Sequence, residues 1–302
     1  MVDLDWTSLP GAGFFYPPPS QPPPQADERM VTRAATPKRA ATAVASVATP
    51  KKARVVANNA RVDALVAELK GKAPVGRVHV FELSEAVQHI SEVNGGRLAR
   101  LVAECGAPPF YHEPQEATTF RSMCRIIVGQ QLAGAAVRAI WAKFIAALGK
   151  DVSAVTPEAV LAHDPQQLRA DAGLSGAKVK AIVDLAEHYA RGDLSDAMLL
   201  DHSLSASALQ AKLTAVKGVG PWSSNMFQMF VLHLPDVFPT GDLGVRNGIA
   251  ASFGLRGSGK NGALDEKKDY EKLEKAMEPY RPYRSVASWY MWRSLETPSF
   301  ME

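Results

Sequence analysis

The sequence lacks several features that mark particular classes of protein, and each absence argues against one class. Its 302 residues include two cysteines, Cys105 and Cys124, too few for a four-cysteine zinc site or an iron–sulfur cluster. So few cysteines also suggest a reducing compartment. No apolar run approaches the roughly 18–20 residues that span a bilayer, so we expect a soluble protein. The N-terminus carries Asp3 and Asp5 and lacks a basic start before an apolar stretch, which argues against a secretory signal or transit peptide.

Excess charge of one sign is also absent from most of the chain. The formal net charge is +3, and residues 1–60 account for all of it, with seven basic and four acidic side chains. Residues 61–302 are therefore formally neutral. If this part binds nucleic acid, it must use a local face or backbone groups, because a uniformly positive surface is not available.

The first part of the chain has the composition of a tail. Residues 10–25 are proline-rich, and residues 29–60 contain alanine, threonine, valine and basic side chains but no acid. This composition predicts disorder over residues 1–76, although residues 61–73 are compatible with a short helix. A nuclear import signal, a DNA-tethering arm and a plain solvated linker all fit such a basic tail.

Residues 77–302 show the pattern of a helical domain. A stripe of apolar side chains at helical spacing runs along residues 134–148, and several segments open with a capping residue followed by proline, the preferred start of a helix. Alternating, strand-like runs are scarce, and the best of them, residues 77–81, is weak. We therefore predict an all-α fold of helices joined by short loops.

A glycine turn divides residues 213–230, "LTAVKGVGPWSSNMFQMF". Gly218 and Gly220 let the backbone approach another molecule closely, and Pro221 starts the next helix well. The unpaired N–H groups of that first turn form a site suited to a phosphate. A plain glycine-capped corner, with Trp222 in the core, fits the same hexapeptide.

Three further elements each allow a structural and a functional interpretation. Asp242 precedes an apolar helix, so it is either an ordinary N-cap or a rigid carboxylate facing a cleft. Trp289 and Trp292 belong either to the core or to the wall of a pocket that stacks a flat heterocycle. The segment "GQQLA" at residues 129–133 is either a connecting turn or a tip that wedges into a base stack.

Five segments taken together resemble the helix-hairpin-helix DNA glycosylases, and most of all the 3-methyladenine DNA glycosylase II branch. They are "FRSMCRIIVGQQLAGAAVRAIWAKF", "GLSGAKVKAIVDLAEHY", "LTAVKGVGPWSSNMFQMF", "DVFPTGDLGVRNG" and "YRPYRSVASWYMWR". The resemblance covers roughly residues 83–296. It implies two helical lobes with the active site in the cleft between them, and the removal of alkylated purines of the 3-methyladenine and 7-methylguanine type from duplex DNA.

The resemblance also implies roles for single residues. Asp242 matches the catalytic aspartate of the family. Trp222 stands where members with lyase activity carry a nucleophilic lysine, which implies a monofunctional enzyme that uses water. Trp292 matches a tryptophan that stacks on the extruded base, and with Trp222 and Met226 it would form the base pocket. Met226 replaces an aromatic residue of bacterial members, which leaves the range of substrates open.

The same resemblance assigns the contacts to DNA. Gln131 and Leu132 match the wedge that fills the gap left by the extruded base. The phosphate-binding hairpin comprises Val216, Gly218, Val219 and Gly220, and in the family its carbonyls often hold Na⁺ or K⁺. No further cofactor is implied, and we expect a monomer acting on damaged duplex DNA in the nucleus.

Some features and alternatives lie outside this interpretation. Residues 256–269 look like an exposed polar loop without an assigned role, and the N-terminal β subdomain of some bacterial members is not evident. A glycosylase of the same superfamily for other damaged bases, including a glycosylase/lyase, remains an alternative. A non-catalytic helix-hairpin-helix DNA-binding module is another, and a helical scaffold that binds no nucleic acid is a third.

Overall fold

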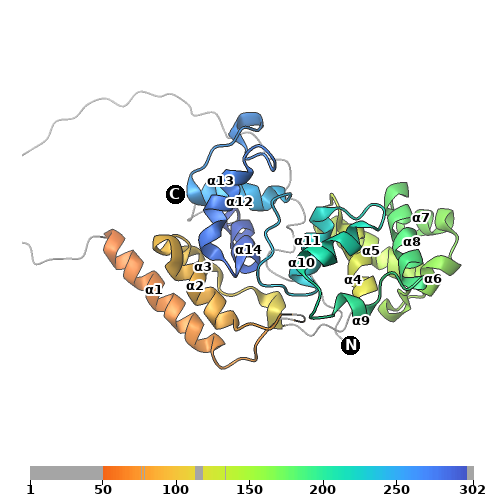
Figure 1. Ribbon diagram of the computed structural model, residues 1–302, viewed down its shortest axis with the longest axis horizontal. Helices are drawn as coiled ribbons and strands as arrows, with labels where there is room; N and C mark the ends of the chain where they lie inside the picture. The colour runs from red at the N-terminus through yellow and green to blue at the C-terminus, as the bar shows by residue number, and fades with distance from the viewer. Residues whose placement is uncertain (1–49, 76, 78, 113–117, 133, 298–302) are drawn as a thin grey trace, which may run out of the picture.

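The computed structural model describes residues 50–75, 77, 79–112, 118–132 and 134–297, and Figure 1 shows their arrangement. The predicted tail before residue 50 lies outside the described residues. Within them the structure is helical, and its β pairing is a bridge between Val75 and Phe81. The α-helices are α1 (Pro50–Leu69), α2 (Leu83–Gly96), α3 (Ala99–Cys105), α4 (Thr119–Gly129), α5 (Gly134–Leu148), α6 (Pro157–Ala162), α7 (Pro165–Ala172), α8 (Gly176–Ala190), α9 (Asp196–Leu199), α10 (Ala206–Thr214), α11 (Pro221–Phe230), α12 (Leu243–Phe253), α13 (Tyr270–Met277) and α14 (Arg284–Ser294). The predicted all-α class is confirmed.

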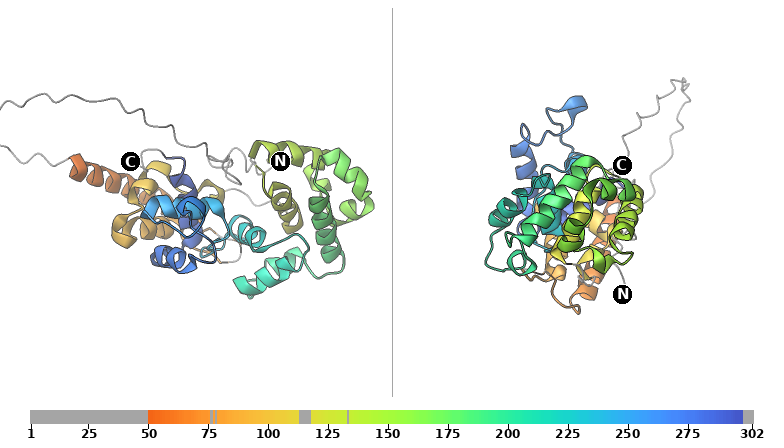
Figure 2. Two further views of the ribbon diagram at one scale, coloured as in Figure 1. Left: turned by 90° about the horizontal axis from the view of Figure 1, so that it is seen from above. Right: turned by 90° about the vertical axis from the view of Figure 1, so that its right-hand side faces the viewer.

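The helices form two lobes, which Figures 1 and 2 show side by side. One lobe runs from α4 to α11, with α6 and α7 packed on α8 and α10 packed on α11. The other joins α1, α2 and α3 to α12, α13 and α14, and α14 packs against both α12 and α3. The chain crosses between lobes after α11, in residues 231–242, which lead directly into α12.

Side-chain caps explain where many of these helices begin. Thr156 and Asp164 each accept a hydrogen bond from the third residue of the helix that follows, and each is succeeded by proline. Ser175 caps α8 in the same way. These bonds satisfy backbone N–H groups that have no partner within the helix. No helix in the described ranges combines the length and the apolar character that crossing a bilayer requires.

The predicted boundary between tail and domain at residue 77 is too late. Helix α1 begins at Pro50 and packs against α2 and α3. Val62, Val66 and Leu69 are at most 6% exposed and belong to the core. They recur at helical spacing, so one face of α1 is apolar and the free energy of burying it fixes the helix on the lobe. The stripe lies within residues 61–73, which are compatible with a short helix by sequence, but nothing in the sequence specifies that this helix packs on the domain.

The segment that crosses between the lobes, residues 231–242, is fixed by contacts with Tyr111 and with the start of α14. His233 is buried and packs edge-on against Tyr111, with ring centroids 5.1 Å apart. Arg284, at the start of α14, binds Asp236 through two hydrogen bonds of 2.7 and 3.0 Å. Ser285 donates to the carbonyl oxygen of Leu234 and accepts the backbone N–H of Val237. The backbone that leads to Asp242 is therefore fixed before α12 begins.

The buried His233 makes stability depend on pH in a defined direction. Burial, together with the nearby charge of Arg77, lowers the pKa of its imidazole to about 4, against an ordinary value of 6.5. In the unfolded chain the His233 imidazole is protonated below about pH 6.5, whereas in the folded chain it stays neutral down to about pH 4. Stability is therefore lost as the pH falls through this window. Between pH 7.5 and 4.5 this one group should cost about 2–3 kcal/mol.

We therefore predict that His233→Asn loses less stability than the wild type over this pH range, by about 2–3 kcal/mol. Asparagine tolerates the positive φ of 53° at this position. Urea unfolding at both pH values measures the difference. An equal loss in variant and wild type would contradict the assignment.

Candidate active site

The glycine turn forms a helical hairpin between α10 and α11. Gly218 has φ 81°, and a Cβ added there would lie 2.8 Å from the Cβ of Ala181 on α8. Asp184 of α8 accepts the backbone N–H of Lys217 at 2.8 Å and its ammonium at 3.0 Å. Although burial alone raises the pKa of the Asp184 carboxyl, these bonds to Lys217 lower it below its usual value. The turn is thus clamped to α8 by a charged side chain and by close packing.

The start of α11 has the character of an anion site. Its N-cap is Gly220, which has no side chain to occupy the first-turn N–H groups, and Pro221 follows at the first helical position. The N-terminal end of a helix carries partial positive charge from the aligned peptide dipoles. Of the predicted hairpin residues, Gly218 and Gly220 lie on the surface of the turn, whereas Val216 and Val219 are buried and fix it to the lobe.

Asp242 lies where the start of α11 meets the start of α12. It is the N-cap of α12, is 6% exposed and accepts the backbone N–H of Val245 at 2.8 Å through Oδ1. The same oxygen accepts the indole N–H of Trp292 at 2.8 Å. Oδ2 accepts the indole N–H of Trp222, also at 2.8 Å. Three N–H donors therefore hold one carboxylate, an arrangement that suits an anion.

Gly244 makes room for this arrangement. A Cβ at this position would lie 2.7 Å from Cδ1 of Trp292, 2.9 Å from its Nε1 and 3.1 Å from Oδ1 of Asp242. Any larger residue would therefore push the indole and the carboxylate apart. The motif "GDLG" thus supplies both the carboxylate and the space that its indole partner needs.

The three predicted pocket residues differ in their surroundings. Trp222 is half-buried and turns its indole edge toward Asp242. Met226 is 1% exposed and lies one turn further along α11. Trp292 is 5% exposed and stacks on Phe230, with centroids 5.7 Å apart and planes inclined by 24°. Trp292 thus supports Asp242 in this structure, and stacking of a base on its ring stays a prediction.

The predicted wedge lies in the turn between α4 and α5. Gln131 is exposed with φ 57°, and Leu132 is partly buried against the core. Their neighbour Gln130 binds the hairpin, because its side-chain amide donates to the carbonyl oxygen of Gly218 and to the hydroxyl of Ser223, both at 2.9 Å. The wedge turn and the hairpin therefore form one surface.

Several of these partners are not apparent from the sequence. The resemblance implies pocket walls at Trp222 and Trp292, whereas in the structure each donates a hydrogen bond to the carboxylate, one from α11 and the other from α14. No motif points to a role for Gly244 or Asp184. A glycine two residues after Asp242, at a helix start, indicates that another group approaches the backbone closely there. Nothing in the sequence specifies that this group is Trp292.

The fold and these contacts define a class. A helical hairpin with an uncapped start to its second helix, joined through a tryptophan to a buried helix-capping carboxylate, is the arrangement expected of a helix-hairpin-helix DNA glycosylase. The family described as "HhH-GPD superfamily base excision DNA repair protein" matches residues 124–282. The chain belongs to this family.

Similar proteins extend the match beyond that range. The alkylbase DNA glycosidase-like protein mag2 of Schizosaccharomyces pombe is 26% identical, covering 70% of this chain and 93% of its own. DNA-3-methyladenine glycosylase 1 of the same yeast is 30% identical, covering 71% and 89%. The solved structure of an S. pombe 3-methyladenine DNA glycosylase with abasic DNA aligns with a TM-score of 0.59 at 26% identity, covering 70% of this chain and 97% of that one.

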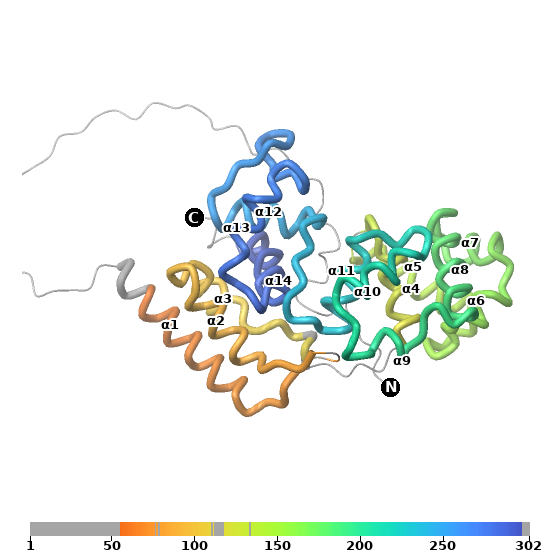
Figure 3. Tube along the Cα trace, viewed as in Figure 1, coloured from red at the N-terminus to blue at the C-terminus, as the bar shows by residue number. Residues whose placement is uncertain are grey.

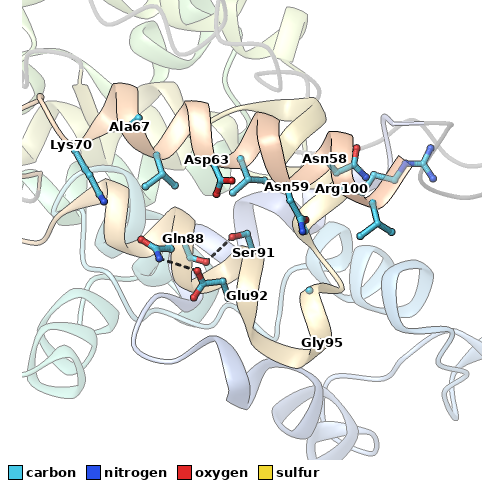
Figure 4. Close-up of a pocket in the computed structure, with 15 residues that line it drawn as sticks. Asn58, Asn59, Asp63, Ala67, Lys70, Gln88, Ser91, Glu92, Gly95 and Arg100 are labelled. Atoms are coloured by element: carbon cyan, nitrogen blue, oxygen red, sulfur yellow. Dashed lines mark hydrogen bonds between the residues drawn. The ribbon is translucent and has the colours of Figure 1, made fainter. Parts of the chain in front are cut away.

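A groove lies away from this site, between α1 and α2 (Figure 4). Its lining includes Asn58, Asn59 and Asp63 from α1, and Gln88 and Glu92 from α2. It contains none of the residues gathered around Asp242, and we assign the candidate active site by the carboxylate and its donors instead.

The close packing of Trp292 against Gly244 can be tested by measuring stability. We predict that Gly244→Ala lowers the free energy of unfolding by about 1–3 kcal/mol, because the added methyl group overlaps Trp292. The control is Gly176→Ala at the first position of α8, where an added Cβ meets nothing within 4 Å. It should be neutral or slightly stabilising. Equal unfolding midpoints of the two variants in urea would show that the Gly244 contact is not tight.

Proposed function

We propose that the protein is a monofunctional DNA glycosylase that turns alkylated purines out of duplex DNA and hydrolyses their N-glycosidic bond, which starts base excision repair. The observation that carries this proposal is the Asp242 carboxylate, held by Trp222 and Trp292 beside the helical hairpin. The names of the relatives, 3-methyladenine and alkylbase glycosylases, support the class of substrate.

Binding would begin at the hairpin. A DNA phosphate fits the start of α11, where Gly220 leaves room for close approach and the helix dipole favours an anion. This backbone contact suits a domain without net positive charge. A Na⁺ or K⁺ ion would add positive charge beside the phosphate. The turn offers carbonyl oxygens for it, and although those of Val216 and Gly218 each accept one hydrogen bond, a carbonyl retains a second lone pair.

The extruded nucleotide would leave a gap for the wedge. Unstacking and unpairing a base costs a few kcal/mol, and an alkylated base is easier to extrude than a well-paired one. Gln131 and Leu132 are suited to fill the gap because Gln130 ties their turn to the hairpin. The wedge would therefore be placed by the same element that binds the phosphate.

Asp242 would act on the sugar as a fixed negative charge. Cleavage of the glycosidic bond makes the sugar resemble an oxocarbenium cation, which a preorganised carboxylate stabilises. Its Oδ1 already accepts two N–H bonds, whereas Oδ2 accepts one. Because a carboxylate oxygen offers about two lone-pair sites, Oδ2 retains the free one. We assign to Oδ2 the contact with the sugar or with the attacking water.

The leaving base needs little help when it is a cationic alkylpurine. Such a base already carries the charge that a general acid would otherwise supply. An electron-rich indole face attracts a cationic ring by about 0.5–2 kcal/mol. Trp222 is the predicted pocket residue with exposed surface, and its ring edge is fixed by Asp242. We therefore favour Trp222 as the first ring to contact the base.

The remaining expectations follow from this assignment. The partner is damaged double-stranded DNA, and a structural neighbour was solved with abasic DNA. We propose that the enzyme acts as a monomer and that it works in the nucleus, where the basic segment of residues 29–60 would direct it.

The central prediction concerns Asp242→Asn. Asparagine still caps the helix, but its NH₂ group cannot accept an indole N–H and the negative charge is lost. We expect single-turnover release of methylated purines from duplex DNA to fall at least about 100-fold, with affinity for the duplex changed only a few-fold. Parallel substrates with hypoxanthine, ethenoadenine and 8-oxoguanine measure the range of lesions.

Asp164→Asn is the matched control. Asp164 also caps a helix, α7, but in the other lobe and at an exposed position. It should release bases at the wild-type rate. Near-wild-type release by Asp242→Asn would exclude Asp242 as the catalytic carboxylate.

A second prediction separates hydrolysis from lyase chemistry. A lyase forms a covalent imine between an amine and the abasic sugar, and borohydride traps it. Trp222 offers no such amine, and the nearby Lys217 is bound to Asp184 on the α8 side of the turn. We expect no trapped adduct on abasic DNA. An adduct that persists in Lys217→Ala would support a glycosylase/lyase and contradict the monofunctional assignment.

A further inference from the structure

The loop between α12 and α13, residues 256–269, contacts residues next to Asp242. Arg246, in the first turns of α12, donates to the carbonyl oxygen of Thr240 at 2.6 Å and to that of Leu264 at 3.0 Å. It therefore joins the residues before Asp242 to the loop. The carboxylate of Glu266 also lies against Gly241, where an added Cβ would meet it at 3.2 Å.

A series of contacts links the wedge turn to this loop. The wedge turn binds the hairpin through Gln130, the hairpin helix binds Asp242 through Trp222, and the backbone before Asp242 binds the loop through Arg246. If DNA lies along the wedge and the hairpin with its sugar at Asp242, the loop that contacts the residues before Asp242 lies near the same duplex. Figure 3 shows the loop projecting from the top of its lobe.

The loop is built around a buried carboxylate. Asp269 is 2% exposed and accepts hydrogen bonds from the backbone N–H groups of Ser258 and Asp265, from the Ser258 hydroxyl and from the ammonium of Lys272. These bonds, led by that from Lys272, hold the pKa of Asp269 well below its usual range. The loop is thus ordered before any partner binds, and little entropy is lost when one does.

The loop presents three lysines to solvent, while of its three acids Asp269 is buried, Asp265 is half-buried and Glu266 is exposed. Lys260, Lys267 and Lys268 are exposed, and within the described residues none of them forms an ion pair. Asp265 accepts the backbone N–H groups of Lys267 and Lys268, and Asp269 is paired with Lys272. Exposed ammonium groups without a carboxylate partner are suited to phosphate oxygens.

We propose that this loop is a second DNA-backbone contact, in which Lys260, Lys267 and Lys268 bind phosphates on the side of the lesion opposite to the hairpin. The inference rests on the proposed function for the placement of DNA. It predicts a contact that is independent of sequence and sensitive to salt, and that adds affinity without touching the base.

The test measures how the affinity of the full chain depends on salt. The probe is a duplex carrying a tetrahydrofuran abasic analogue, followed by fluorescence anisotropy. The slope of log affinity against log salt should decrease in magnitude by about 1 for each phosphate-binding lysine that is removed. We expect the slope of Lys260→Ala/Lys267→Ala/Lys268→Ala to be smaller in magnitude than that of the wild type by at least about 1. Replacing the same lysines by arginine should retain the wild-type slope.

The matched control removes exposed cations on or just after α1 that form no ion pair within the described residues, in Arg61→Ala/Lys70→Ala. Its slope should equal that of the wild type. Duplexes shortened on one side of the analogue locate the contact, because trimming the loop side should abolish the difference between wild type and loop variant. An unchanged slope in the loop variant, an equal decrease in the control, or indifference to trimming on both sides would overturn the inference.

Failure of the proposed function gives a different result. If the wild type releases no base from methylated DNA while the loop variant shows the shallower slope, the loop contact stands and the catalytic assignment fails. If the wild type releases base and the slope is unchanged, only the loop inference fails.

Discussion

The structure depends on the hydrogen bonds that two indole groups donate to Asp242. Trp222 comes from the hairpin helix and Trp292 from α14, so one carboxylate joins elements of both lobes. Each N–H bond to a charged acceptor contributes about 1.5–3 kcal/mol, and burial excludes water that would compete for the same oxygens. The position of the carboxylate is thereby set relative to the hairpin, and with it the distance from a bound phosphate to the sugar that it would act on.

The surroundings of this carboxylate are organised to keep it in place. Gly244 lets the indole of Trp292 approach, and Arg284 and Ser285 fix the segment that leads into α12. On the hairpin side, Asp184 holds the turn against α8. A domain that lacks net positive charge can then bind DNA through backbone groups and a few placed cations, because the elements that carry them are rigid before DNA arrives.

The sequence predicted the local features well and the distant contacts poorly. Local features depend on residues that are neighbours in the sequence. They include the helix starts, the glycine hairpin and the cap at Asp242, and the structure has them where they are expected. The pairing of Asp242 with Trp292 joins positions 50 residues apart, and that of Gln130 with Gly218 spans 88. No periodicity encodes such pairs. The packing of α1 on α2 and α3 is likewise a distant contact, because the helical spacing of Val62, Val66 and Leu69 indicates a helix but not its partners.

The most direct test of the account compares two abasic analogues in duplex DNA, a cationic pyrrolidine and a neutral tetrahydrofuran of similar shape. If the Asp242 carboxylate stabilises positive charge on the sugar, the wild type should bind the cationic duplex at least about 10-fold more tightly, as expected for a mimic of the transition state. Asp242→Asn should lose that preference while its affinity for the neutral duplex stays close to that of the wild type. Equal affinities of the wild type for both duplexes would contradict the central claim.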